Sequence, residues 1–147
     1  MLNQKTILLV EDNADDELLT IRALKKNNIV NVIVARDGVE ALDFLFGVVK
    51  DIDKEKNTLP ALIILDLKLP KIDGLEVLKR IRAESRTKFI PVVVLTSSNE
   101  EKDILLSFGL GANSFIRKPV DFTRFVEVAG NIGVYWLVLN ESPKTES

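Results

Sequence analysis

The sequence contains neither cysteine nor histidine. Without cysteine the chain has no disulfide, no thiol nucleophile and no thiolate metal site. Without histidine it has no Ser-His-Asp triad, no histidine zinc site and no histidine of its own to carry a phosphoryl group. Its chemistry must therefore come from carboxylates, hydroxyls, lysines and a hard metal that prefers oxygen ligands.

The chain also lacks a strong excess of either charge, because its formal net charge is -2. No global basic field draws it to nucleic acid or to an anionic membrane, so we expect neither as a partner. The N-terminus has no basic stretch followed by an apolar one, and the apolar runs are too short to span a membrane. We expect a cytoplasmic protein.

The 147 residues, 46% of them hydrophobic and 29% charged, suit one compact domain with a full core. We expect this domain to occupy residues 1–133. Residues 134–147 would extend the last helix and end in a polar tail, without a separate output domain.

Apolar runs with the length of buried strands alternate along the chain with segments of helical periodicity. The strand-like runs are Thr6–Val10, Asn31–Ala35, Ala61–Leu65, Ile90–Leu95 and Asn113–Arg117. The helical segments are Leu18–Lys25, stopped at Asn27-Asn28; Val39–Phe46, entered through Asp37-Gly38; Leu75–Arg82; Ile104–Phe108; and Phe122–Ile132, capped by Asp121. This alternation predicts an α/β protein with a doubly wound, five-stranded parallel sheet covered on both faces.

Polar residues follow four of these strands, where each one ends. In such a sheet, ligands bind beyond the carboxyl ends of the strands. We therefore expect one crevice to contain Glu11, Asp12, Asp66, Thr96 and Lys118. Two unit charges about 4 Å apart repel by roughly 4 kcal/mol at an effective dielectric of 20, so three converging carboxylates need a counter-ion.

Each acid also has a simpler interpretation. Asp66 is suited to attack phosphorus and form a mixed anhydride, but a lone Asp after a strand is more often a cap. Glu11 and Asp12 could be first-turn acids favoured by a helix dipole. Together with Asp66 they resemble Mg²⁺ ligands, and a backbone carbonyl near Lys68 could supply one more.

The hydroxyl and the lysine have alternatives too. Thr96 could donate to a phosphoryl oxygen or cap the following helix, and Ser98 is an equally plausible cap. A lysine at a strand end is usually a solvated charge, but Lys118 would be the cation fixed at this rim. Pro119 favours a rigid bend after Lys118, with a cis peptide bond as a candidate.

Four motifs in this order resemble the receiver domain of two-component response regulators. They are Ile-Leu-Leu-Val-Glu-Asp-Asn, Ile-Ile-Leu-Asp-Leu-Lys-Leu-Pro-Lys-Ile-Asp-Gly, Val-Val-Val-Leu-Thr-Ser-Ser and Phe-Ile-Arg-Lys-Pro. The resemblance runs from about Thr6 to Ile132 and implies the flavodoxin-like (βα)5 receiver fold. It also implies that Asp66 accepts a phosphoryl group from a phosphohistidine on a sensor histidine kinase.

The resemblance assigns roles to the other positions. Glu11 and Asp12 would bind Mg²⁺ with Asp66 and the Lys68 carbonyl. Thr96 and Lys118 would contact the phosphate. Thr96 and Phe115 would form the switch, although a partly buried strand phenylalanine explains Phe115 equally well. Lys68 and Ser98 would influence the lifetime of the phosphate.

Some details look like the single-domain, phytochrome-associated branch of this family, which implies a phytochrome-type kinase. They are Asn13-Ala14-Asp15-Asp16, the long polar connection before Pro60, and Tyr135-Trp136-Leu137. Many receivers have Asp where this chain has Glu11, so we expect metal binding to be tuned rather than lost.

The apolar segment Val134–Leu139 favours a homodimer formed through the last helix, with Tyr135, Trp136 and Leu137 as the contact residues. The alternative is that this segment folds back on its own core.

Two other functions compete with signalling through phosphorylation. One is a receiver-like binding module that works without phosphorylation. The other is a Mg²⁺-dependent aspartyl-phosphate phosphatase, which is disfavoured because such enzymes need an acid where this chain has Lys68. We expect a signalling protein that assists its own phosphorylation and slow dephosphorylation, not an enzyme.

Overall fold

The computed structural model describes residues 5–47, 59–98, 100–118 and 121–139. Its strands form one parallel five-stranded sheet in the order β2-β1-β3-β4-β5. The strands are β1 Ile7–Val10, β2 Val32–Ala35, β3 Leu62–Leu65, β4 Val92–Thr96 and β5 Ser114–Arg117. The helices are α1 Ala14–Lys25, α2 Gly38–Phe46, α3 Gly74–Ala83, α4 Glu101–Gly109 and α5 Phe122–Ile132. The predicted fold is confirmed.

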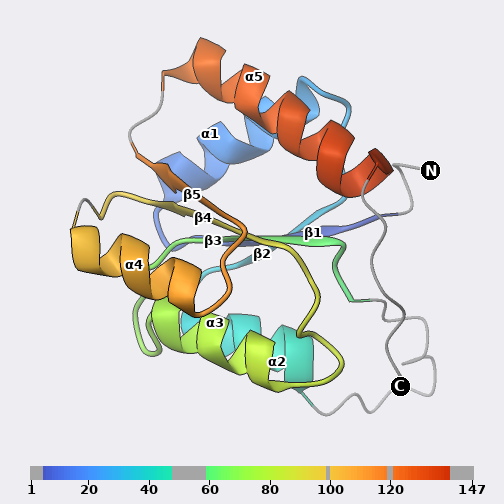
Figure 1. Ribbon diagram of the computed structural model, residues 1–147. Coiled ribbons are helices and arrows are strands. Elements are labelled where there is room, and N and C mark those ends of the chain that lie inside the picture. Colours follow the sequence, from blue (N-terminus) through green and yellow to red (C-terminus); the bar gives the residue numbers. More distant parts are fainter. Residues whose placement is uncertain (1–4, 48–58, 99, 119–120, 140–147) are drawn as a thin grey trace.

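The helices cover both faces of the sheet. In Figure 1, α1 and α5 lie on one face, and α2, α3 and α4 lie on the other. Side chains alternate between the two faces along a strand, so Leu8 and Val10 of β1 pack in one core layer and Ile7 and Leu9 in the other. Coverage on both sides explains why β1 and β3 are buried at every position.

Short polar side chains start most of the helices. Asn13, Asp37, Asp73 and Asp121 each accept a hydrogen bond from the backbone N–H three residues later, at the starts of α1, α2, α3 and α5. The expected starts at Asp37 and Asp121 are therefore confirmed. Helix α4 differs, because Glu100 at its N-cap makes no side-chain capping bond.

The end of α5 departs from the expectation. The chain continues past Ile132 as a π-helical segment, Gly133–Leu139, rather than as more α-helix. Tyr135 is 50% exposed, but Leu137 is only 2% exposed and packs in the core layer on the α1 and α5 face. Leu137 as a dimer contact is therefore wrong, and the fold-back alternative is correct for this side chain. Trp136 is half-buried against the same layer.

Two expectations fall outside the described residues: the conformation of the peptide bond at Pro119, and most of the polar connection before Pro60. In the part of the chain that is described, no helix is both long enough and apolar enough to cross a membrane.

Arg82 joins α3 to the far end of the sheet, away from the polar rim. Its guanidinium donates to the Gly111 carbonyl at 2.7 and 3.1 Å, and to the Ile90 carbonyl at 2.7 Å. It also donates to the Lys88 carbonyl and to Asn113 Oδ1, each at 3.1 Å. Five N–H groups in a planar fork suit this role, which a single ammonium could not fill.

Replacing Arg82 with Ala should therefore lower the free energy of unfolding by about 2 to 4 kcal/mol, because several partly buried carbonyls lose their donor. Urea denaturation measures this loss. Arg80→Ala, two residues away, is the matched control, since the exposed Arg80–Glu76 pair should contribute less than about 1 kcal/mol. Equal losses in the two variants would contradict the role of Arg82.

Candidate functional site

The sheet's order brings the acidic ends of two strands together. Strand β1 lies between β2 and β3, and the register pairs Val10 with Leu65. The next residues, Glu11 and Asp66, are therefore neighbours at the rim. The Asp66 N–H donates to the Val10 carbonyl at 3.0 Å, which ties the two strand ends directly.

Three carboxylates converge at this point. One oxygen each from Glu11, Asp12 and Asp66 lies within 4.8 Å of the others. Glu11 is 1% exposed and Asp66 is 5% exposed, whereas Asp12 is open to solvent. A set of carboxylate oxygens with one open side fits a hard divalent cation such as Mg²⁺, which keeps several waters.

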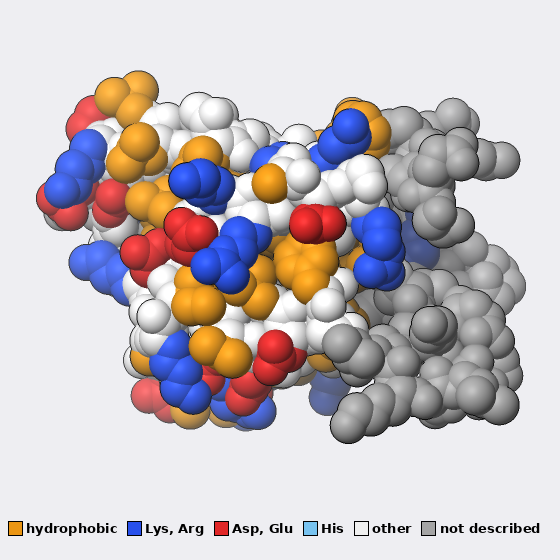
Figure 2. Space-filling view, turned by 90° about the horizontal axis from the view of Figure 1, so that it is seen from below, with side chains coloured by type: hydrophobic (Ala, Val, Ile, Leu, Met, Phe, Trp, Pro, Cys, Tyr) orange, Lys and Arg blue, Asp and Glu red, His pale blue; other side chains and the backbone are white. Residues whose placement is uncertain are grey.

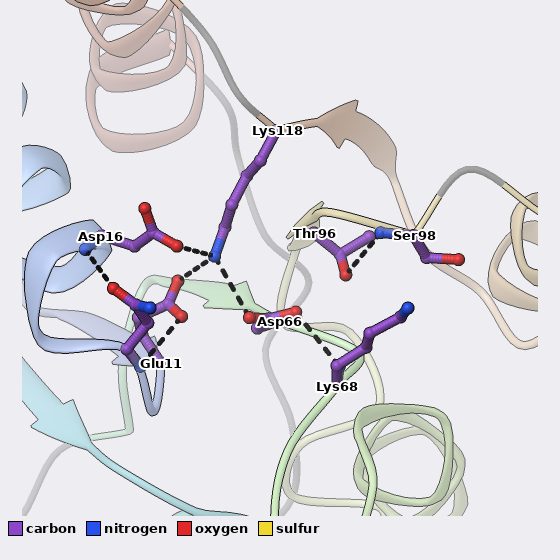
Figure 3. A network of polar contacts seen from close by, with 8 residues as sticks. Glu11, Asp16, Asp66, Lys68, Thr96, Ser98 and Lys118 are labelled. Carbon is purple, nitrogen blue, oxygen red and sulfur yellow. Dashed lines mark hydrogen bonds and ion pairs between the residues drawn. The ribbon is translucent and has the colours of Figure 1, made fainter.

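Lys118 supplies the positive charge of the site. Its Nζ lies 2.7 Å from Glu11 Oε1, 3.1 Å from Asp66 Oδ2 and 2.9 Å from Asp16 Oδ2. Figure 3 shows this ammonium pointing between the three carboxylates. The ion pairs confirm that Lys118 faces the acids and is not a solvated surface charge.

Asp16 was not among the expected site residues. It lies in the first turn of α1, where an acid is expected from the helix dipole alone. Its spacing of five residues from Glu11 gave no sign that both side chains reach the same ammonium.

Burial and neighbouring charges shift the pKa values in this cluster. Burial raises the pKa of Glu11 to about 7, the nearby Asp66 adds to the rise, and the hydrogen bond from Lys118 opposes it. Burial alone would lower the pKa of Lys118, but its hydrogen bonds to Glu11 and Asp16 outweigh this, and the pKa lies above its usual value. Lys118 is therefore a fixed cation at neutral pH.

The start of α3 holds Asp66 from the other side. A Cβ on Gly74 would lie 2.3 Å from the Asp66 carbonyl oxygen, so only glycine allows this close approach. The Lys68 N–H donates to Asp66 Oδ1 at 3.1 Å. In Figure 3 the exposed Lys68 side chain extends away from Lys118 and toward the side of Thr96 and Ser98.

Thr96 and Phe115 lie on the same face of the sheet. Thr96 is fully buried, and its Oγ1 accepts the Ser98 N–H at 3.3 Å. Phe115 pairs with Val94 and is partly buried against the core layer on the α4 side. Val94 and Thr96 are two residues apart on β4, so their side chains point to the same face of the sheet. Phe115 lies beside Val94 on the neighbouring strand, so it points to that face as well.

Comparison with known proteins gives the class of this protein. The response regulator receiver domain family matches residues 7–129. The chain belongs to this family, as its motifs indicated.

Individual relatives indicate which kind of receiver domain the chain resembles. The chain is 40% identical to response regulator Rcp1 of Synechocystis over 134 residues, which cover 90% of this chain and 89% of Rcp1. The structure of the phosphorylated cyanobacterial phytochrome response regulator RcpA is similar, with a TM-score of 0.83 and 38% identity over 95% of this chain and 99% of RcpA. The Mn²⁺-bound form of Rcp1 gives a TM-score of 0.80, with 38% identity and the same coverage of both chains. The chain is thus a receiver domain of two-component phosphorelay signalling, homologous to single-domain regulators, and its kind of partner is a histidine kinase.

The shifted pKa of Glu11 predicts how stability depends on pH. In a metal-free buffer the folded protein should bind more protons than the unfolded chain between the ordinary pKa of 4.5 and the raised value of about 7. The free energy of unfolding should then fall as the pH rises through this range. Glu11→Gln, which resembles the protonated side chain, should be more stable than the wild type at pH 8 by roughly 2 to 3 kcal/mol.

This advantage should shrink toward pH 5, where Glu11 is protonated in the wild type. Urea denaturation in EDTA at several pH values measures it. Glu127→Gln is the control, because Glu127 is exposed on α5, away from the cluster. A pH-independent gain in Glu11→Gln would contradict the burial of a titrating carboxylate.

Proposed function

We propose that Asp66 accepts a phosphoryl group from a sensor histidine kinase of phytochrome type, in a Mg²⁺-dependent reaction. The observation that carries this proposal is the position of the Asp66 carboxylate, between the Lys118 ammonium and the acids Glu11 and Asp12. A cytoplasmic location is part of the proposal.

Each residue of the site has a separate role in the proposed reaction. An Asp66 oxygen attacks phosphorus as the bond from phosphorus to the donor nitrogen breaks, and the donor leaves with that electron pair. Lys118, 3.1 Å from Asp66 Oδ2, neutralises charge that spreads over the phosphoryl oxygens. The Thr96 hydroxyl donates to one of those oxygens.

Glu11, Asp12, Asp66 and the Lys68 backbone carbonyl would hold Mg²⁺. When bound, the cation offsets the negative charge shared by the acids and the phosphoryl group. Two findings support this ligand set: the clustered carboxylate oxygens of this chain, and the Mn²⁺-bound form of its relative Rcp1.

Slow hydrolysis would end the signal. The Lys68 side chain extends beside Asp66, where it would hinder an attacking water. Ser98 is buried next to Thr96 and would limit access from that side. These two side chains are the ones we propose to set the lifetime of the phosphorylated form.

The response to phosphorylation would pass through Thr96 and Phe115 to α4. As Thr96 moves toward the phosphoryl group, Phe115 would turn further into the space beside it, which shifts an existing equilibrium between two states. Helix α4 carries exposed apolar side chains suited to a partner, namely Leu105 at 66% and Leu106 and Phe108 at 50% each. Figure 2 views the face formed by α2, α3 and α4, where hydrophobic side chains reach the surface among charged ones.

The other two functions have less support. A module that works without phosphorylation would need no complete acceptor site, whereas here Asp66, Thr96 and Lys118 all lie at the same rim of the sheet. A phosphatase would need an acid two residues after Asp66, and the chain has Lys68 there.

We also propose that residues 1–133 form the receiver domain and that residues 134–147 extend its last helix.

Incubation with acetyl phosphate and Mg²⁺ tests the acceptor. The mass of the intact wild type should rise by one phosphoryl group, and neither Asp66→Asn nor the wild type in EDTA should show the increase. Asp73→Asn is the matched control, since it changes another acid of the same loop and asparagine also caps a helix well. Modification of Asp66→Asn to the wild-type extent would overturn the assignment.

We propose, further, that the protein forms a homodimer through the end of α5 and the π-helical segment. Exposed Val134 and Tyr135 support this, with 55% and 50% of their surfaces open. Half-buried Trp136 would contribute at the edge of the contact.

Sedimentation tests the dimer. The wild type should sediment as a dimer, and Tyr135→Ser should shift it toward monomer. Leu137→Ala is the contrasting variant, because loss of a buried leucine should cost about 2 to 5 kcal/mol of stability and leave the exposed contact in place. A wild type that stays monomeric at every concentration, with and without an acyl-phosphate mimic, would end the proposal.

A further inference from the structure

The loop between β4 and α4 contains a contact that the functions above do not use. The Ser98 hydroxyl donates to Asp103 Oδ2, in the first turn of α4. Ser98 is 1% exposed and Asp103 is half-buried, so this hydrogen bond to a carboxylate is largely shielded from water. Charge-assisted bonds of this kind are among the stronger ones in proteins.

The Ser98 hydroxyl also accepts a hydrogen bond at the start of α4. Ser98 Oγ accepts the Glu100 N–H at 3.4 Å, at the helix start that lacks a capping side chain. Both hydrogen-bonding roles of the Ser98 hydroxyl are thus occupied. The bond to Asp103 fixes the rotamer of Ser98, and the Ser98 hydroxyl in turn holds the Glu100 N–H.

The loop in turn touches the acceptor site. The Ser98 N–H donates to Thr96 Oγ1 at 3.3 Å, as Figure 3 shows. When Thr96 Oγ1 accepts this bond, its own hydrogen is directed elsewhere and is available to an incoming phosphoryl oxygen. Thr96 is completely buried, so water does not compete for its hydroxyl.

We infer that Asp103 is a positioning residue for phosphoryl transfer to Asp66, acting through Ser98 to orient the hydroxyl of Thr96 as a donor. This inference rests on the proposed function of Asp66 and adds a residue of α4 to the machinery of the reaction. It also connects α4 to Thr96 through two successive hydrogen bonds, Asp103 to Ser98 and Ser98 to Thr96, in addition to the packing of α4 against the sheet.

The rate of phosphorylation by acetyl phosphate tests the inference. In this step an Asp66 oxygen forms a bond to phosphorus, the bond from phosphorus to the acetyl oxygen breaks, and acetate leaves with the electron pair. Asp103→Ala should slow the step about fivefold, the factor expected for one lost hydrogen bond. Asp103→Asn should stay near the wild-type rate, because its amide oxygen still accepts the Ser98 hydroxyl.

Glu101→Ala is the matched control. It removes a negative charge from the same helix turn, but Glu101 is exposed and forms none of the hydrogen bonds of Ser98. It should phosphorylate at the wild-type rate. A general effect of charge or of helix stability would slow Glu101→Ala and Asp103→Asn as well, and that result would overturn the inference.

A double-mutant cycle separates positioning from stability. Ser98→Ala should slow the reaction by a similar factor, and Asp103→Ala should have no further effect in that background. If Asp103→Ala slows both backgrounds equally, or slows neither, Asp103 does not act through Ser98. If the wild type itself gains no phosphoryl group, the proposed function fails first, whereas normal labelling of the wild type with an unchanged Asp103→Ala rate refutes the inference alone.

Discussion

The Lys118 ammonium and the carboxylates around it form the interaction on which the rest of the site depends. Glu11 and Asp66 are buried at adjacent strand ends, and two buried negative charges at this separation would repel strongly. Lys118 contacts both, and also Asp16, from the end of β5. Even so, burial and then Asp66 raise the pKa of Glu11 to about 7, so the hydrogen bond from Lys118 does not fully offset them. Under the proposed function, a divalent cation would offset the negative charge that remains.

Helix α4 has an unusual arrangement of polar and apolar side chains. Ser107 is the buried side chain of α4, and its hydroxyl has no hydrogen-bond partner among the described residues. Leu105, Leu106 and Phe108 of the same helix face solvent. This is the reverse of the usual arrangement, in which apolar side chains face inward. Glu100, at the N-cap of α4, also makes no side-chain capping bond. The bond between Ser98 and Asp103 connects this helix to Thr96 through the Ser98 N–H.

The sequence predicted those features that depend on local chemistry. Aliphatic runs of strand length, the helix entry at Asp37-Gly38 and the cap at Asp121 located the elements. The rule about strand ends brought Glu11, Asp12, Asp66, Thr96 and Lys118 to one rim. Contacts between side chains distant in the chain were harder. An acid in a first helical turn, such as Asp16, looks the same whether or not it reaches Lys118. Leu137 looked like a surface residue because an apolar side chain near the chain end carries no sign of what packs against it.

A crystal structure with Mn²⁺ and beryllofluoride, a mimic of the acyl phosphate, tests the central claim most directly. The account predicts anomalous density for the metal among Glu11, Asp12, Asp66 and the Lys68 carbonyl. It also predicts the beryllofluoride group on Asp66, with Lys118 and Thr96 in contact with fluorine. Metal bound elsewhere, or an unmodified Asp66 with Lys118 turned toward solvent, would contradict it.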